Sequence, residues 1–198
     1  MTEILTISTA DAAAIGPGRL ILVVGPSGAG KDTLLGLAKA ACADDPNTVF
    51  PRRVITRQAS ASEDNEEVSA GTFQEAVERG HFSVHWEAHG HRYALSRAID
   101  DDIRAGRTVV ANVSRTVISA MRGAYADVVV VLVTAPANVL AERIALRARG
   151  SDGGPEQRLN RTVEDASTAP DVTIVNVSSA EYHARQFVRI VRGEKWDE

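Results

Sequence analysis

The sequence is poor in cysteine: Cys42 is the single thiol among 198 residues. One cysteine excludes an internal disulfide and a cysteine-based zinc site, and it fits a reducing compartment. No apolar run approaches the roughly 20 residues that a membrane-spanning helix needs. We therefore expect a cytoplasmic protein that has no membrane partner.

An excess of positive charge is also missing. The 26 acidic residues outnumber the 22 lysines and arginines, which gives a formal net charge of −4. We therefore expect no nucleic-acid partner, because such binding needs a broadly basic surface. Any anionic ligand must be held by local groups of basic residues.

The first 18 residues contain no lysine or arginine, although they include Glu3 and Asp11. A signal peptide opens with a basic segment, so this stretch does not read as one. We expect a short N-terminal extension over 1–18 that ends in the Gly16-Pro17-Gly18 turn.

The most informative stretch lies between an apolar run, 20–24, and a helix-like segment, 34–43. It has the G-x-x-x-x-G-K pattern of a phosphate-binding loop, in which glycines let successive backbone N–H groups point at phosphate oxygens. The following helix adds the positive end of its dipole, and the lysine brings a full charge to the outer phosphates. The alternative is a glycine-rich turn that merely contains a lysine, but strand, loop and helix stand in the required order. The predicted nucleotide-binding residues are Gly25, Pro26, Ser27, Gly28, Ala29, Gly30, Lys31, Asp32 and Thr33.

Asp32 stands where the usual pattern has a Ser or Thr hydroxyl that binds Mg²⁺, and Thr33 comes one position later. A carboxylate can hold Mg²⁺ directly or through water, so Asp32 is the candidate metal ligand. The D-x-x-G and N-K-x-D motifs of GTPases do not occur in the chain, which leaves ATPases and small kinases.

Beyond the loop, apolar segments alternate with helical patterns. Thr72 with Glu75, and Ser178 with Glu181, read as capping boxes that begin two helices. The polar passage 57–70 predicts a loop or a mobile lobe. Further strands are predicted at 50–56, 108–113, 127–134 and 172–177. Strands that alternate with helices indicate a parallel α/β sheet with helices on both sides.

Several motifs resemble those of guanylate kinases. Segments 25–31 and 54–57 resemble the phosphate loop and the acceptor-binding T-T-R segment of that family. Residues 68–93 follow its V-S-x-x-x-F…G-x-F…H-G-x-x-Y pattern, and the arginines of 147–158 resemble its lid. The resemblance implies a three-layer α/β/α phosphate-loop kinase domain with a parallel sheet. Its expected parts are the domain at 19–198, a small acceptor-binding lobe at about 53–95 and an arginine-rich lid at about 147–161.

The departures from guanylate kinases concern the acceptor. The second acceptor arginine of that family falls at Ser60, and its guanine-reading glutamate aligns with Val84. The two aspartates of its D-I-D strand become Asn112 and Ser114, and its acceptor tyrosine has no counterpart in 63–68. Valine accepts no hydrogen bond, and an unpaired buried donor costs about 1–3 kcal/mol. GMP is therefore not the expected acceptor.

The chain resembles more closely the ribose 1,5-bisphosphate phosphokinases of phosphonate breakdown. It carries their G-P-S-G-A-G-K-D at 25–32, R-x-I-T-R at 53–57, W-x-A-H-G at 86–90 and V-V-A-N-V-S-R at 109–115. Asp32 is part of this pattern. The resemblance implies that ATP, with Mg²⁺, phosphorylates the 1-phosphate of a small phosphorylated sugar, ribose 1,5-bisphosphate. The products would be ADP and 5-phosphoribosyl diphosphate.

The resemblance also implies roles for individual residues. An oxygen of the acceptor phosphate is already ionised at pH 7, because the second pKa of a phosphate monoester is near 6, so no general base is required. Catalysis then consists of positioning two anions and screening their repulsion. The expected catalytic cations are Lys31, Arg147, Arg149 and Arg158. The expected acceptor-binding residues are Arg53, Arg57, Tyr93, His89, Asn112 and Ser114.

Simpler roles stay open for several residues. The lid arginines could form ordinary surface salt bridges, and Tyr93 could simply pack inside the lobe. The acidic run at 63–67 could orient sugar hydroxyls or Mg²⁺, although such a run is usually just solvated. The histidines His85, His89 and His91 suggest zinc, but they lack a cysteine or carboxylate at suitable spacing.

Two rival functions also stay open. A nucleoside monophosphate kinase would keep the reaction class and change the acceptor. A non-catalytic guanylate-kinase-like binding module would have lost the phosphate loop, whereas Gly25, Gly30 and Lys31 are present here. The sequence does not fix the oligomeric state, for which a homodimer is one candidate.

Overall fold

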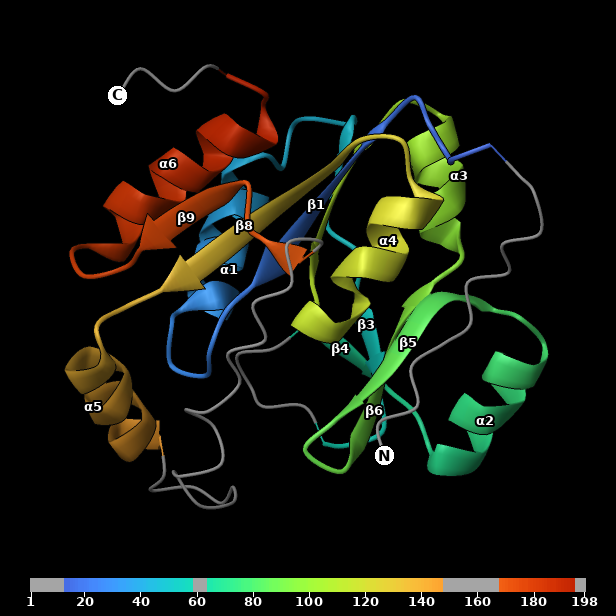
Figure 1. The fold of residues 1–198 in the computed structure, drawn as a ribbon, viewed down its shortest axis with the longest axis horizontal. Coiled ribbons are helices and arrows are strands. Elements are labelled where there is room, and N and C mark those ends of the chain that lie inside the picture. The colour runs from blue at the N-terminus through green and yellow to red at the C-terminus, as the bar shows by residue number, and fades with distance from the viewer. Residues whose placement is uncertain (1–12, 59–63, 148–167, 195–198) are drawn as a thin grey trace.

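The computed structural model describes residues 13–58, 64–147 and 168–194, and Figure 1 shows their arrangement. The chain forms two β-sheets with helices packed around them. In chain order the elements are β1 (Arg19–Val24), α1 (Lys31–Ala41), β2 (Thr48–Val49), β3 (Arg53–Ile55), β4 (Asn65–Glu67), α2 (Ala70–Glu78), β5 (Phe82–Ala88), β6 (His91–Ser96), α3 (Ala98–Arg104), β7 (Thr108–Asn112), the 3-10 helix η1 (Arg115–Val117), α4 (Ile118–Ala124), β8 (Val128–Thr134), α5 (Ala137–Arg147), β9 (Val172–Val175) and α6 (Ala180–Val191).

The large sheet has five parallel strands in the order β2-β7-β1-β8-β9. Successive residues of the central strand β1 point to opposite faces. Leu20 and Leu22 share a buried cluster with Ile118 of α4, whereas Ile21 shares another with Phe187 of α6. Helices α1 and α6 lie on one side and α3 and α4 on the other (Figure 1). The predicted three-layer α/β/α fold with a parallel sheet is confirmed, and its double coverage explains the continuous apolar strands.

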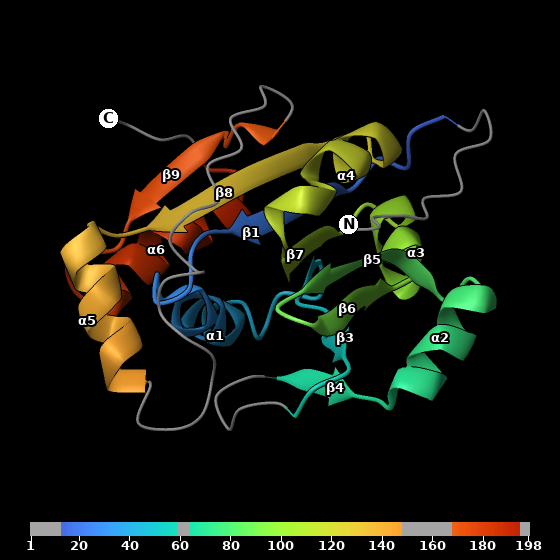
Figure 2. The same cartoon turned by 60° about the horizontal axis from the view of Figure 1, so that its bottom comes forward.

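The small sheet has four strands in the order β4-β3-β6-β5. Strands β3 and β4 are parallel, and the pairs β3–β6 and β5–β6 are antiparallel. Helix α2 packs on this sheet through Phe73, whose ring centroid lies 5.0 Å from that of Phe82. In Figure 2 the small sheet and α2 stand at the opposite end of the molecule from α5. One face of this sheet packs on α2, whereas Ile55, Trp86 and Leu95 on its other face share the buried cluster of Leu20 and Leu22 in the large sheet.

Two local predictions were wrong, and a third needs detail. The passage predicted as a loop or a mobile lobe contains β4, which forms because its backbone pairs with β3. Helix α2 is capped by Ser69, whose Oγ accepts the N–H of Thr72 at 3.0 Å, so Thr72 lies inside the helix. Helix α6 is likewise capped by Ser179, whose Oγ accepts the N–H of Tyr182 at 3.2 Å. In both helices a suitable serine sits close to the predicted cap, and spacing alone does not choose between them.

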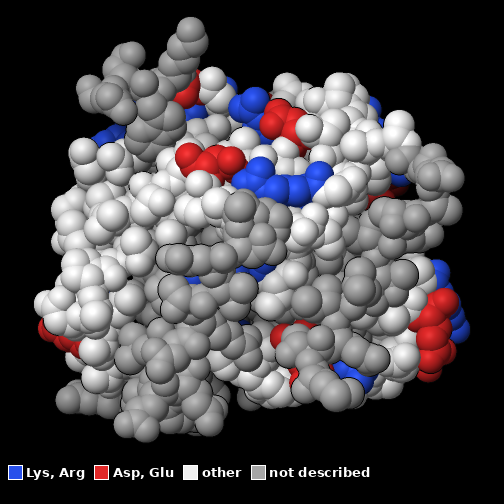
Figure 3. All heavy atoms as spheres, viewed as in Figure 1, with Lys and Arg blue, Asp and Glu red and all other residues white. Residues whose placement is uncertain are grey.

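The chain before β1 is tied to the large sheet. The backbone N–H of Ile15 donates to Ala124 at 2.8 Å, and Ala126 donates to Ile15 at 2.9 Å. On the face drawn in Figure 3, several of the described lysines and arginines lie beside acidic side chains. The described part of the chain includes no helix long and apolar enough to cross a membrane.

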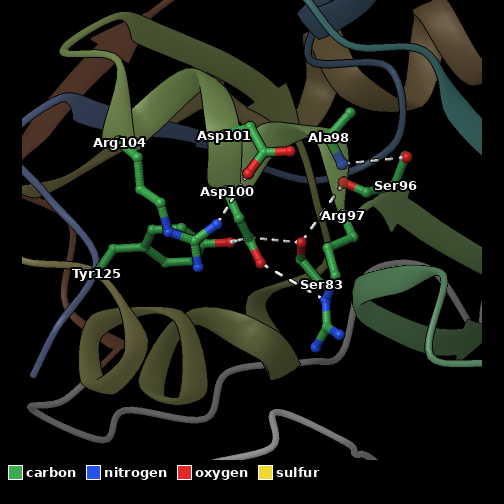
Figure 4. Close-up of polar contacts among 8 residues, drawn as sticks. All are labelled: Ser83, Ser96, Arg97, Ala98, Asp100, Asp101, Arg104 and Tyr125. Atoms are coloured by element: carbon green, nitrogen blue, oxygen red, sulfur yellow. Dashed lines mark hydrogen bonds and ion pairs between the residues drawn. The ribbon is translucent and has the colours of Figure 1, made fainter. Parts of the chain in front are cut away.

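A buried carboxylate joins the small sheet to the helices of the large one. Asp100 of α3 is 5% exposed and accepts hydrogen bonds from Ser83 Oγ at 2.7 Å and Tyr125 Oη at 2.6 Å (Figure 4). Arg97 Nε lies 3.7 Å from its other oxygen. Burial raises the pKa of the Tyr125 hydroxyl well above its usual value, and the hydrogen bond and charge of Asp100 raise it further. Tyr125 therefore stays a proton donor and keeps β5, α3 and α4 together.

Replacement of Tyr125 by Phe should lower the free energy of unfolding by about 1.5–3 kcal/mol, because it removes a hydrogen bond to a buried charged group. Urea denaturation followed by circular dichroism measures the change. Tyr182→Phe is the matched control, since Tyr182 is 49% exposed and should change stability by less than about 0.5 kcal/mol. Equal effects of the two substitutions would show that Asp100 does not hold these elements together.

Candidate active site

The phosphate loop runs from the end of β1 to the start of α1. Gly25 and Gly30 have φ angles of 150° and 88°, a region that favours glycine. A Cβ on Gly25 would collide with the carbonyl of Val133, and one on Gly30 with the side-chain amide of Asn176. Both glycines are therefore required by the conformation of the loop and by its close neighbours.

Lys31 is the first residue of α1 and its side chain turns back over the loop. Its Nζ donates to the carbonyl oxygens of Gly25 at 2.8 Å and Pro26 at 3.0 Å. In the described part of the chain no side chain caps this helix at Gly30. The N-terminal N–H groups of α1 and the ammonium group thus favour a polyanion at one place.

Two predicted site residues meet beside this loop. Asp32 lies in the first turn of α1, and its Oδ1 accepts a hydrogen bond of 3.1 Å from Nδ2 of Asn112. Asn112 ends β7 and is in register with Val23 of β1. The pair therefore stands where the carboxyl ends of adjacent parallel strands place ligands. Its carboxylate and amide oxygens are the kind of donors that Mg²⁺ prefers.

Ser114 lies two residues beyond Asn112 and caps η1. Its Oγ accepts hydrogen bonds from the Thr116 hydroxyl at 2.9 Å and from the Thr116 N–H at 3.4 Å. The structure places Ser114 at the same edge of the sheet as Asn112 and gives it this local role.

The small sheet brings together three other predicted residues. Nε of Arg57 donates to the hydroxyl of Tyr93 at 3.3 Å, and the guanidinium of Arg53 lies 5.9 Å from the centroid of the Tyr93 ring. Tyr93 is 8% exposed and stacks on Trp86, with ring centroids 5.7 Å apart. Asn65, which the sequence did not single out, accepts a hydrogen bond from Arg53 Nε at 3.2 Å. Two guanidinium groups are thus held around one aromatic ring.

His89 lies apart from this group, whereas Val84 packs in the same apolar cluster as Tyr93. His89 is exposed in the turn between β5 and β6, where its φ of 55° is left-handed. Val84 is 3% exposed and belongs to the apolar cluster that contains Trp86 and Tyr93. Its side chain is therefore part of the packing of the lobe.

The predicted lid falls largely outside the described residues, including Arg149 and Arg158. Arg147 is the last residue of α5. The same helix contributes Arg143, whose Nη1 lies 3.5 Å from the carbonyl oxygen of Gly28. The helix that leads to the lid therefore touches the phosphate loop.

A second contact to the loop was missed from the sequence. Asn176 is 5% exposed, and its Nδ2 donates to the carbonyl of Ala29 at 2.8 Å. It follows β9, so an amide stands at the end of an otherwise apolar strand. This position at the carboxyl edge of the sheet is the signal that could have identified it.

Helix α1 and the small sheet line one cleft of about 130 Å³, and Asp32, which follows the phosphate-loop lysine, stands at one end of it. Helix α1 forms one wall, and the region of β3 and β4 forms the other (Figure 2). Its polar and charged lining residues are Asp32, Lys39, Arg53, Asp64, Asn65 and Asn112. A ligand in this cleft would lie beside the phosphate loop and would face cations from the small sheet.

No family model matches the chain. Among solved structures, it is similar to guanylate kinase from Anaplasma phagocytophilum, with a TM-score of 0.58 and 19% identity over 91% of this chain and 86% of that one. Similarity at this level of identity shows the fold, which is guanylate-kinase-like.

Similarity to curated proteins is much higher. The chain is 63% identical, over the full length of both, to ribose 1,5-bisphosphate phosphokinase PhnN of Bradyrhizobium diazoefficiens. It is 61% identical to the protein of the same name from Rhodopseudomonas palustris, over 90% of each chain. The protein of that name from Methylobacterium radiotolerans is 48% identical over 89% of this chain and 98% of its own length. The chain therefore belongs to the family of ribose 1,5-bisphosphate phosphokinases.

Proposed function

We propose that this protein transfers the γ-phosphate of ATP to the 1-phosphate of ribose 1,5-bisphosphate, which yields ADP and 5-phosphoribosyl diphosphate. One observation carries the proposal. Asp32, next to Lys31 of the phosphate loop, and Arg53 of the small sheet line the same cleft, so a donor and an anionic acceptor can lie side by side. The names of the full-length relatives support this choice of acceptor.

The transfer forms a bond between an oxygen of the 1-phosphate and the γ-phosphorus, and it breaks the bond from the γ-phosphorus to the β–γ bridging oxygen. The attacking oxygen is ionised at neutral pH, so the protein needs no general base. Its task is to hold two anions in line and to offset their repulsion. Lys31 would bind the β- and γ-phosphates, and Arg53 and Arg57 would hold the acceptor.

Mg²⁺ fits the pair of Asp32 and Asn112, because their side chains offer a carboxylate and an amide oxygen. The two side chains are already in contact, with Nδ2 of Asn112 3.1 Å from Oδ1 of Asp32. The ion supplies neutralisation of phosphate charge when bound. Arg147, Arg149 and Arg158 would offset the charge of the transferred group. His89 and Ser114 would contribute to the acceptor side of the site.

The acceptor is tested by ADP release from Mg²⁺-ATP, with ribose 1,5-bisphosphate and GMP offered in parallel. We expect turnover with the sugar bisphosphate and little with GMP. Turnover with GMP alone would instead make the protein a nucleoside monophosphate kinase. Absence of turnover with both would contradict the proposed acceptor and leave a binding module as the rival.

Lys31→Ala should lower kcat by about 10²–10³-fold, because the ammonium offsets charge that develops on the transferred group. The melting temperature of the variant checks that any loss of turnover is not a loss of folding. Arg104→Ala is the control, since Arg104 is exposed and pairs with Asp101 of α3. Normal turnover of the Lys31 variant would exclude this lysine from catalysis.

Asp32→Asn should raise the Mg²⁺ concentration needed for half-maximal turnover several-fold, since it removes a negative charge from the metal ligand. The substitution keeps an oxygen that can accept the hydrogen bond from Asn112. A titration of Mg²⁺ at fixed ATP measures the shift, with the exposed Asp44→Asn as control. An unchanged titration would place the metal elsewhere.

A further inference from the structure

The end of the cleft away from the phosphate loop carries a group of ion pairs. Nζ of Lys39 lies 2.6 Å from one carboxylate oxygen of Asp64, and Nε of Arg52 lies 2.9 Å from the other. Lys39 belongs to α1, whereas Arg52 and Asp64 directly precede β3 and β4. The three side chains therefore connect the helix of the phosphate loop to the small sheet.

A fourth residue fixes the two arginines of this region. Nη2 of Arg52 donates to the backbone carbonyl of Asn65 at 2.7 Å, and Nε of Arg53 donates to its side-chain oxygen at 3.2 Å. Asn65 is 8% exposed, so the packing around it fixes its position. Its two oxygens hold adjacent guanidinium groups at the edge of the cleft.

Among the described residues at this end of the cleft, positive charges outnumber negative ones. Lys39, Arg52 and Arg53 bring three positive charges, and Asp64 is the carboxylate that pairs with two of them. The hydrogen bond from Lys39 lowers the pKa of Asp64, and the charges of Lys39 and Arg52 lower it further. The carboxylate is therefore ionised at neutral pH, and an anion of higher charge could still be accommodated.

The position of this group along α1 fits a ligand with two anionic ends. Lys39 follows Lys31 by eight residues, or about 12 Å along a helix. Asp32, Leu35, Gly36 and Lys39 recur at helical spacing and line the cleft between these two points. An acceptor whose first phosphate meets the γ-phosphate near Lys31 would extend its other end toward Lys39.

We propose that Lys39, Arg52 and Arg53 bind the 5-phosphate of the acceptor. In the absence of that phosphate Asp64 pairs with Lys39 and Arg52, and the phosphate displaces it. The inference rests on the proposed function, because it identifies the second phosphate subsite of the same cleft. The exchange costs little: the side chains of Lys39, Arg52 and Asp64 are 53%, 55% and 58% exposed, and ion pairs so exposed contribute little to stability. A phosphate offers more oxygens to the same donors.

Lys39→Gln tests the subsite. We expect its KM for ribose 1,5-bisphosphate to rise by about 10–100-fold, the usual effect of losing a hydrogen bond between charged groups. The KM for ATP should stay within about two-fold. Arg79→Gln is the charge-matched control. Arg79 caps the C-terminal end of α2 and is 68% exposed, and its Nη2 lies 4.0 Å from Oε2 of Glu75.

A truncated acceptor separates binding of the 5-phosphate from a general effect on the lobe. With ribose 1-phosphate, wild type and Lys39→Gln should have the same kcat/KM. Ribose 5-phosphate should inhibit wild type competitively against the acceptor and should inhibit Lys39→Gln about 10-fold more weakly. A loss that is equal for both acceptors would overturn the subsite and would make Lys39 a structural link.

Asp64→Asn gives the opposite expectation. Removing the competing carboxylate should tighten binding of ribose 5-phosphate by several-fold, as measured by titration calorimetry without turnover. Unchanged or weaker binding would overturn the displacement of Asp64.

The two proposals fail differently. If wild type turns over ribose 1,5-bisphosphate while Lys39→Gln keeps its KM, the subsite is wrong and the function stands. If wild type does not turn over this acceptor, the function is wrong, and calorimetry with ribose 5-phosphate still reports on the cations.

Discussion

The phosphate loop keeps its conformation because neighbouring atoms leave no room for a side chain at two of its glycines. The carbonyl of Val133 lies against Gly25, and the amide of Asn176 lies against Gly30 and bonds the carbonyl of Ala29. Val133 lies in β8 and Asn176 directly follows β9, and these two strands come after β1 in the order of the sheet. Any side chain at either glycine would push the loop from this support. The order of the parallel sheet therefore determines the geometry at which phosphate binds.

Much of this fold can be predicted from the sequence because the strands of the large sheet are buried on both faces. The runs at 20–24 and 128–133 are apolar without interruption, and the glycine pattern between β1 and α1 has one structural solution. Strand β4 could not be predicted in this way. Its residues, Asn65–Glu67, have neither apolar character nor alternation, and they are extended because β3 supplies hydrogen bonds.

The site was predicted as separate residues, and only the fold shows which of them meet. Asp32 and Asn112 are 80 positions apart and bond because Val23 and Asn112 are in register. Arg57 and Tyr93 meet through the pairing of β3 with β6. Asn65 and Asn176 were missed, since an asparagine carries no pattern of its own. Their roles depend on the backbone that passes beside them.

The two edges of the small sheet are held by different forces. At the β5 edge, Ser83 donates a hydrogen bond to the buried Asp100. Removal of such a partner would leave a buried polar group without a hydrogen bond. At the β4 edge, Asp64 meets Lys39 in an exposed ion pair, where water competes for both charges. The first link resists exchange, while the second can trade one anion for another at little cost. The lobe thus has a fixed edge on the helices and an exchangeable edge on the cleft, where an acceptor would enter.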